Sequence, residues 1–299
     1  MSTTSVAADS LPKIVTARRG RMRFLRFWTS RVGLAMLVFV VLVALLGPVF
    51  APHSPTEIIG VPFANPGSGW PFGTDFLGRD VLSRVLYGGR SLIGLSVLAT
   101  IGGYAIGLPA GLLAGYRRGA VDFVLMRGVD VLLAFPPLLF LLIVATGTTE
   151  SILALVVAVA IILSPGLTRI VRAAVLDVSQ RSYVEAALVR GEGTPRILRR
   201  EILPNILGVI LADVGLRLTY AILLIAAMNF LGLGLQPPKA DWALMISENR
   251  IALSLQPWAV FVPAIFIACL VVSINLIADG IARSLGTSIE ALGGEAQGR

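Results

Sequence analysis

The chain has 299 residues, of which 56% are hydrophobic and only 14% charged, with a mean hydropathy of +0.85. A soluble domain carries about 25% charged residues, so the composition excludes one and indicates an integral membrane protein. The net charge of +8 does not indicate nucleic acid, because the basic residues lie between apolar runs, where they suit the anionic cytoplasmic face of a membrane.

The residue types that carry catalysis are sparse. The one cysteine, Cys269, and the one histidine, His53, have no partner at metal-ligand spacing. Neither Lys13 nor Lys239 follows a G-x-x-x-x-G pattern, so the chain has no phosphate-binding loop of its own. We therefore expect a non-catalytic chain with no metal and no cofactor.

Six apolar segments are long enough to cross a membrane. A basic tail at 1–31 precedes an uncharged run at 32–51, which is too long for a signal-peptide core and predicts a first transmembrane helix. A domain at 91–280 holds the other five, and a short tail at 281–299 follows. These five spans are expected at 91–116, 123–147, 151–170, 206–231 and 257–278. The span at 91–116 has glycines at three- and four-residue spacing, which predicts close helix packing in lipid. Pro136 and Pro137 should bend the third, and Ser164-Pro165-Gly166 should interrupt the fourth.

Residues 52–90 are rich in proline and glycine and are expected outside the cell. Asp75 is expected to cap a short amphipathic helix that lies on the outer interface. Its apolar side would carry Leu77, Val81, Leu82, Val85 and Leu86, and its polar side Arg79, Asp80, Ser83 and Arg84.

The positive charges predict the orientation. The two tails, the 116–118 turn and the 169–204 loop hold eighteen Lys and Arg residues, whereas the other loops hold five. Because cytoplasmic loops carry the excess of Lys and Arg, both termini are expected to be cytoplasmic.

The loop at 171–205 contains a polar island, Tyr183–Asn205, which predicts two short surface helices. Gly191 suits a left-handed stop to the first helix, Pro195 can begin the second, and Pro204 is expected to end it. Such a unit fits a groove on a partner, where Glu185 would meet a basic residue. On composition alone, an ordinary interfacial loop is equally compatible.

Two charged residues, Asp213 and Arg217, lie within the fifth span. At a spacing of four they share a helix face and can neutralise each other. Ionisable groups at this depth should face the bundle interior or a cavity. A role in the pathway or gate, together with Pro165, and a purely structural role both remain open.

The island resembles the EAA loop of ABC importer permeases, through E-A-A-x-x-x-G and a following L-P. Other segments resemble the dipeptide/oligopeptide/nickel branch and its C-type subunit, including F-G-T-D-x-L-G-R-D (Phe72–Asp80) and F-L-G-L-G-L-Q-P-P (Phe230–Pro238). The resemblance implies ATPase-coupling residues at Tyr183, Glu185, Ala186, Ala187, Leu188, Arg190, Gly191, Leu203 and Pro204. It implies an external motif at Asp75, Gly78, Arg79 and Asp80.

The same resemblance implies an all-α, type I ABC importer (MetI-like) permease fold with six transmembrane helices in the bacterial inner membrane. Its expected partners are a homologous permease, two cytoplasmic ATP-binding subunits that hold ATP and Mg²⁺, an extracytoplasmic binding protein and lipid. The cargo would be peptides or a related small solute. The sequence departs from the family pattern at Glu192–Pro195 and by carrying Asp213 and Arg217. A self-sufficient secondary transporter or channel and a membrane scaffold are the alternatives.

Overall fold

The computed structural model describes residues 27–67, 69–148 and 151–297, with side chains through Ser284. Most of the predicted basic tail lies outside this range. The helices are α1 (Trp28–Phe50), α2 (Val81–Arg117), α3 (Gly119–Ala134), α4 (Pro137–Gly147), α5 (Ile152–Val178), α6 (Ser182–Val189), α7 (Thr194–Ile197), α8 (Leu203–Phe230), α9 (Trp242–Asn249) and α10 (Trp258–Gln297). A π-helical turn, η2 (Leu198–Ile202), joins α7 to α8.

Five helical stretches are long and apolar enough to cross a membrane, and α3 with α4 makes a sixth if this bent pair counts as one span. The two helices meet at 84°. Phe135 and Pro136 are extended, with ψ of 128° and 125°, because a residue that precedes a proline is driven out of the helical region. The bend predicted at Pro136-Pro137 is therefore confirmed.

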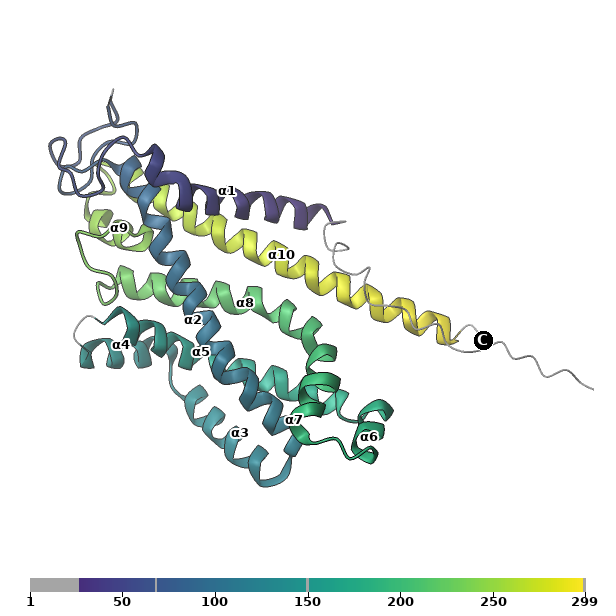
Figure 1. Cartoon of the computed structure of the whole chain (residues 1–299). Coiled ribbons are helices and arrows are strands. Elements are labelled where there is room, and N and C mark those ends of the chain that lie inside the picture. The colour runs from purple at the N-terminus through teal and green to yellow at the C-terminus, as the bar shows by residue number, and fades with distance from the viewer. Residues whose placement is uncertain (1–26, 68, 149–150, 298–299) are drawn as a thin grey trace, which may run out of the picture.

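The bundle has two distinct ends (Figure 1). At one end lie α9 and the segment 52–80, and at the other lie α6 and α7. The helices α1 and α10 run side by side along one edge, while α2 crosses the bundle obliquely against α5. The long helix α8 connects the two ends.

The most extensive helix contact, between α2 and α5, contains a row of glycines on α2. Gly103, Gly107, Gly111 and Gly115 all face α5, and a Cβ at Gly107 would lie 2.7 Å from the Ser164 carbonyl oxygen. The predicted small-residue packing is thus confirmed, since only a missing side chain lets the backbones approach so closely. Thr168 donates from its hydroxyl to the Gly107 carbonyl, at 3.3 Å, across this contact.

Three helix boundaries differ from the predictions. The expected interfacial helix within 52–90 is wrong, because residues 81–90 are the first turns of α2. Its cap is Asp80, which accepts from the Leu82 and Ser83 amides, and not Asp75. The expected interruption of the fourth span is also wrong, since α5 continues through Pro165.

Pro204 does not end a surface helix. It occupies the first turn of α8, where a proline has no backbone hydrogen bond to lose. The chain stays helical from Thr194 to Phe230 because the wide turn η2 absorbs the change before Pro204. The second predicted surface helix is therefore the beginning of a membrane span.

The helix α9 is fastened between α2 and α8 by one buried carboxylate. Asp241 accepts from the Ala243 and Leu244 amides, from Asn229 of α8 at 3.0 Å and from Ser91 of α2 at 2.8 Å. Complete burial raises the pKa of this carboxyl above its usual value, against the lowering effect of the four donors. The four bonds fix the beginning of α9 against both long helices.

Trp242 follows and is fully buried, donating from its indole Nε1 to the Val85 carbonyl at 2.8 Å. Its ring lies against Gly89, where a Cβ would be 2.5 Å from the nearest ring carbon. We expect Gly89→Ala to lower the free energy of unfolding by about 1–3 kcal/mol through overpacking.

The matched control is Gly94→Ala on the same helix, where no atom lies within 4 Å of the added Cβ. This change should be neutral or stabilise by about 0.5–1 kcal/mol, because alanine favours a helix over glycine. Thermal unfolding in detergent compares the two. Equal melting temperatures for both variants would contradict the packing of Trp242.

Candidate coupling surface and membrane pathway

The helix α6 is attached to the bundle by its apolar face. Val184 and Ala187 are buried, and they pack with residues of α5, α7, η2 and α8. The other members of this apolar seat are Leu167, Val171, Val175, Ile197, Ile202, Ile206 and Ile210. The buried face of α6 therefore belongs to the same apolar cluster as residues of α5 and α8.

A Schellman motif ends α6. Glu192 donates its amide to the Ala187 carbonyl at 3.1 Å, and Gly191 donates to the Leu188 carbonyl at 2.9 Å. Gly191 has a φ of 78°, the left-handed conformation predicted for it. The sharp turn lets Pro195 begin α7 only a few residues later.

The opposite face of α6 is open. Glu185, Ala186, Leu188 and Arg190 are exposed, and the Tyr183 side chain is 39% exposed. Partial burial raises the pKa of the Tyr183 phenol above its usual value. Arg190 pairs with Glu192 at 2.9 Å. Leu203 and Pro204, in contrast, belong to α8 and are not part of this helix.

A surface hollow lies beside this open face, between the end of α2 and α6. It is lined by Tyr116, Arg117, Arg118, Ser179, Gln180, Glu185 and Leu188. The hollow places two arginines and a carboxylate around the exposed face of α6. This arrangement suits contact with a polar protein surface.

The predicted pair in the fifth span forms. Arg217 donates from Nε to Asp213, at 3.0 Å to Oδ2, and the Tyr104 hydroxyl of α2 lies 3.0 Å from the same oxygen. The side chain of Asp213 is 5% exposed and that of Arg217 is 16% exposed. Tyr104 was not predictable as a partner, because it comes from a helix more than 100 positions away.

Arg217 also lines a pocket between α3, α4, α5 and α8. The other lining residues are Leu132, Leu133, Phe135, Pro137, Phe140, Ile161, Ile162, Gly166 and Tyr220. Pro165 is buried within α5 and is not among them, although its neighbour Gly166 is. The pocket is apolar except at Arg217 and Tyr220.

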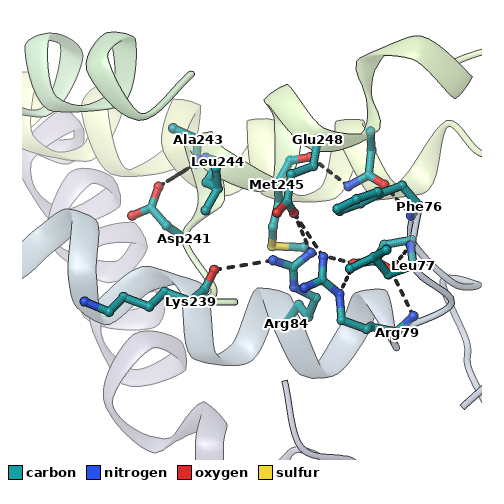
Figure 2. Close-up of polar contacts among 12 residues, drawn as sticks. Phe76, Leu77, Arg79, Arg84, Lys239, Asp241, Ala243, Leu244, Met245 and Glu248 are labelled. Atoms are coloured by element: carbon teal, nitrogen blue, oxygen red, sulfur yellow. Dashed lines mark hydrogen bonds and ion pairs between the residues drawn. The ribbon is translucent and has the colours of Figure 1, made fainter. Parts of the chain in front are cut away.

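The third candidate region is a buried ion cluster at the α9 end, formed by Asp75, Arg79, Arg84 and Glu248 (Figure 2). Asp75 accepts from Arg79 Nε at 2.7 Å and from Arg84 Nη1 at 2.5 Å. Glu248 of α9 accepts from Arg84 Nη1 at 2.6 Å. Both arginine side chains are at most 2% exposed.

The predicted amphipathic helix is also wrong about which side is exposed. The expected polar side, with Arg79, Asp80, Ser83 and Arg84, is buried, whereas Leu77 is 42% exposed. The charges balance because two arginines meet two carboxylates, which is how buried charges are tolerated. Gly78 has a φ of 79° and is required, since a Cβ there would lie 2.1 Å from the Gly60 oxygen.

Residues 107–290 match the family model described as the binding-protein-dependent transport system inner membrane component. Residues 17–65 match the model of the N-terminal TM domain of oligopeptide transport permease C.

Curated relatives are similar over most of their length. The dipeptide transport system permease protein DppC of Haemophilus influenzae is 33% identical over 266 residues, which are 87% of this chain and 90% of that protein. The oligopeptide transport system permease protein OppC of Bacillus subtilis is 34% identical over 266 residues, which are 88% of this chain and 87% of that protein.

A solved structure supports the fold. One chain of an inward-facing MetNI methionine ABC transporter superposes with a TM-score of 0.53 at 18% identity, covering 64% of this chain and 92% of that chain. This likeness concerns the fold alone. The predicted all-α, MetI-like permease fold is confirmed.

The chain therefore belongs to the family of inner membrane components of binding-protein-dependent transport systems. It is a multi-pass membrane protein and a permease subunit of an ABC importer.

The ion cluster leads to a stability prediction. Arg84→Met leaves two carboxylates and one arginine in a buried site. Because one carboxylate then lacks a balancing charge, the free energy of unfolding should fall by about 3–5 kcal/mol. The double variant Arg84→Met with Glu248→Gln restores a neutral cluster. Its free energy of unfolding should therefore fall by less than that of Arg84→Met alone. Thermal unfolding in detergent measures both.

The matched control is Arg181→Met, which breaks an exposed pair with Asp177, 58% and 69% exposed. This change should cost at most about 1 kcal/mol. A double variant less stable than Arg84→Met would show that charge balance does not explain the cluster.

Proposed function

We propose that this chain is the non-catalytic permease subunit of an ATP-driven importer of di- or oligopeptides in the bacterial inner membrane. It forms half of the pathway with a homologous permease. Two cytoplasmic ATP-binding subunits hold ATP and Mg²⁺, and an extracytoplasmic binding protein delivers the peptide. The names of the relatives, which are dipeptide and oligopeptide permeases, support this cargo.

One observation carries the proposal: α6 has one face held in the apolar seat and the other open at the end of the bundle. A partner that binds Glu185, Ala186 and Leu188 moves a helix that contacts α7 and η2 and shares one apolar cluster with α5 and α8. Because α8 carries Arg217 and Tyr220 of the membrane pocket, motion at α6 reaches that pocket through one continuous helix.

Glu185 supplies the first test. In a complex reconstituted with its partner subunits and loaded binding protein, Glu185→Lys should lower ATP-dependent peptide uptake by at least about tenfold. A reversed charge at a protein contact loses a favourable pair and gains a repulsive one. Uptake and ATP hydrolysis are measured in the same vesicles.

The control is Asp279→Lys, which reverses an exposed carboxylate on α10. It should leave uptake within about twofold of wild type, an effect of less than about 0.5 kcal/mol. Uptake that proceeds without ATP would indicate a secondary transporter. Failure to purify with any ATP-binding subunit would indicate a scaffold.

The orientation gives a second test. In a Cys269→Ser background, Ala120→Cys at the beginning of α3 and Ile58→Cys in the segment before α2 introduce single exposed thiols. A membrane-impermeant maleimide should label Ile58→Cys from outside intact cells and Ala120→Cys only in inverted vesicles. The reverse pattern would overturn the proposed topology.

A further inference from the structure

Arg217 forms an ion pair with Asp213 through one edge of its guanidinium group only. Its Nε donates to both Asp213 oxygens, at 3.2 and 3.0 Å, and Tyr104 holds Asp213 from α2. This fixes the guanidinium by its inner edge. Within the described part of the chain, neither terminal nitrogen of Arg217 has a hydrogen-bond partner.

The terminal nitrogens lie against Gly166 of α5. A Cβ at this position would be 2.6 Å from Nη1 and 3.1 Å from Nη2 of Arg217. Gly166 therefore provides the space for the guanidinium at the wall of the pocket. The outer edge of the group keeps its N–H donors available in a site that is otherwise mostly apolar.

A guanidinium edge with free N–H groups is matched by a carboxylate, which accepts two parallel hydrogen bonds. Asp213 balances the charge of Arg217, so an incoming anion meets a site of zero net charge. Binding is then weak enough for release, which a transport pathway requires because a ligand held too tightly does not leave.

The depth of the site favours a solute over a lipid headgroup. Arg217 is thirteen residues from the end of α8 at Phe230, or about 20 Å along the helix. The hydrocarbon layer is about 30 Å thick, so Arg217 lies within it and away from the headgroup phosphates.

A second, apolar hollow continues from the pocket along α8. It is lined by Pro136, Pro137, Leu138, Tyr220, Leu223, Leu224 and Ala227, and it shares Pro137 and Tyr220 with the Arg217 pocket. An anion recognised by Arg217 thus has an apolar space next to it. The combination matches the last residue of a peptide, which has a carboxylate and a side chain.

We propose that Arg217 binds the C-terminal carboxylate of the peptide in transit, while the side chain of that residue occupies the apolar hollow. The inference rests on the proposed function as a peptide importer. It assigns substrate recognition to the membrane subunit, separately from the binding protein.

The test uses alanyl-phenylalanine and its C-terminal amide as probes. The complete complex is reconstituted in phosphatidylcholine vesicles, and initial uptake is measured with saturating binding protein loaded with either peptide. Loading to saturation removes the binding protein's own preference between the two. Wild type should take up the free acid about tenfold faster than the amide, as expected for loss of a charge-assisted hydrogen-bonded contact.

Arg217→Gln should bring the two rates within about twofold of each other by slowing the acid. Gly166→Ala keeps the charge but displaces the guanidinium, so it should lower the ratio as well. The control Gly128→Ala adds a methyl group where no atom lies within 4 Å and should leave the ratio unchanged. If Arg217→Gln does not assemble, Asp213→Asn with Arg217→Gln removes both charges and carries the same expectation.

The outcomes separate the two proposals. Wild-type vesicles that take up neither peptide with ATP would overturn the proposed function. Uptake of both peptides with an acid-to-amide ratio that Arg217→Gln and Gly166→Ala leave unchanged would overturn only the inference. A ratio that responds to these variants only when phosphatidylglycerol is added would assign Arg217 to lipid phosphate and would also overturn it.

Discussion

The backbone contact between α2 and α5 determines where the candidate coupling surface and the Arg217 pocket lie. Four glycines on α2 bring the two helices together, and Thr168 bonds across the contact to Gly107. Both candidate regions depend on this position of α5. Its segment at Leu167–Val175 forms one wall of the apolar seat of α6, and Gly166 forms the wall of the Arg217 pocket. Bulky residues on α2 would separate the helices and displace both.

Charge neutrality is the second constraint. The described bundle buries Asp75, Arg79, Arg84 and Glu248 at one end and Asp213 with Arg217 in its middle. The end cluster satisfies its arginines largely within the protein and fixes α9 to α2, so it acts as a structural fastening. Among the described residues, the middle pair leaves the outer edge of Arg217 without a hydrogen-bond partner. The two sets of buried arginine–carboxylate pairs therefore differ in how many arginine N–H donors remain available for a ligand.

Local patterns predicted local structure well. The glycine row of α2, the bend at Pro136-Pro137 and the left-handed stop at Gly191 all follow from the conformational limits of single residues. The burial of Arg79 and Arg84 was not predictable, because their partner Glu248 lies more than 160 positions away. The prediction that Pro204 ends a surface helix was wrong because it considered Pro204 without the turn that precedes it. A proline stops a helix from its interior but is compatible with the first turn, and only the structure shows that η2 leads into α8.

The central claim is that motion enters at α6 and reaches the membrane pocket through α8. Leu223, which is 49% exposed, lines the apolar hollow and reports on it when replaced by cysteine in a Cys269→Ser background. The most direct measurement is the rate at which a thiol reagent labels this cysteine in the complete complex, with and without ATP. If motion enters at α6, ATP should change the labelling rate when Glu185 is present, and Glu185→Lys should remove the change. An equal response to ATP in the Glu185→Lys complex would contradict the central claim.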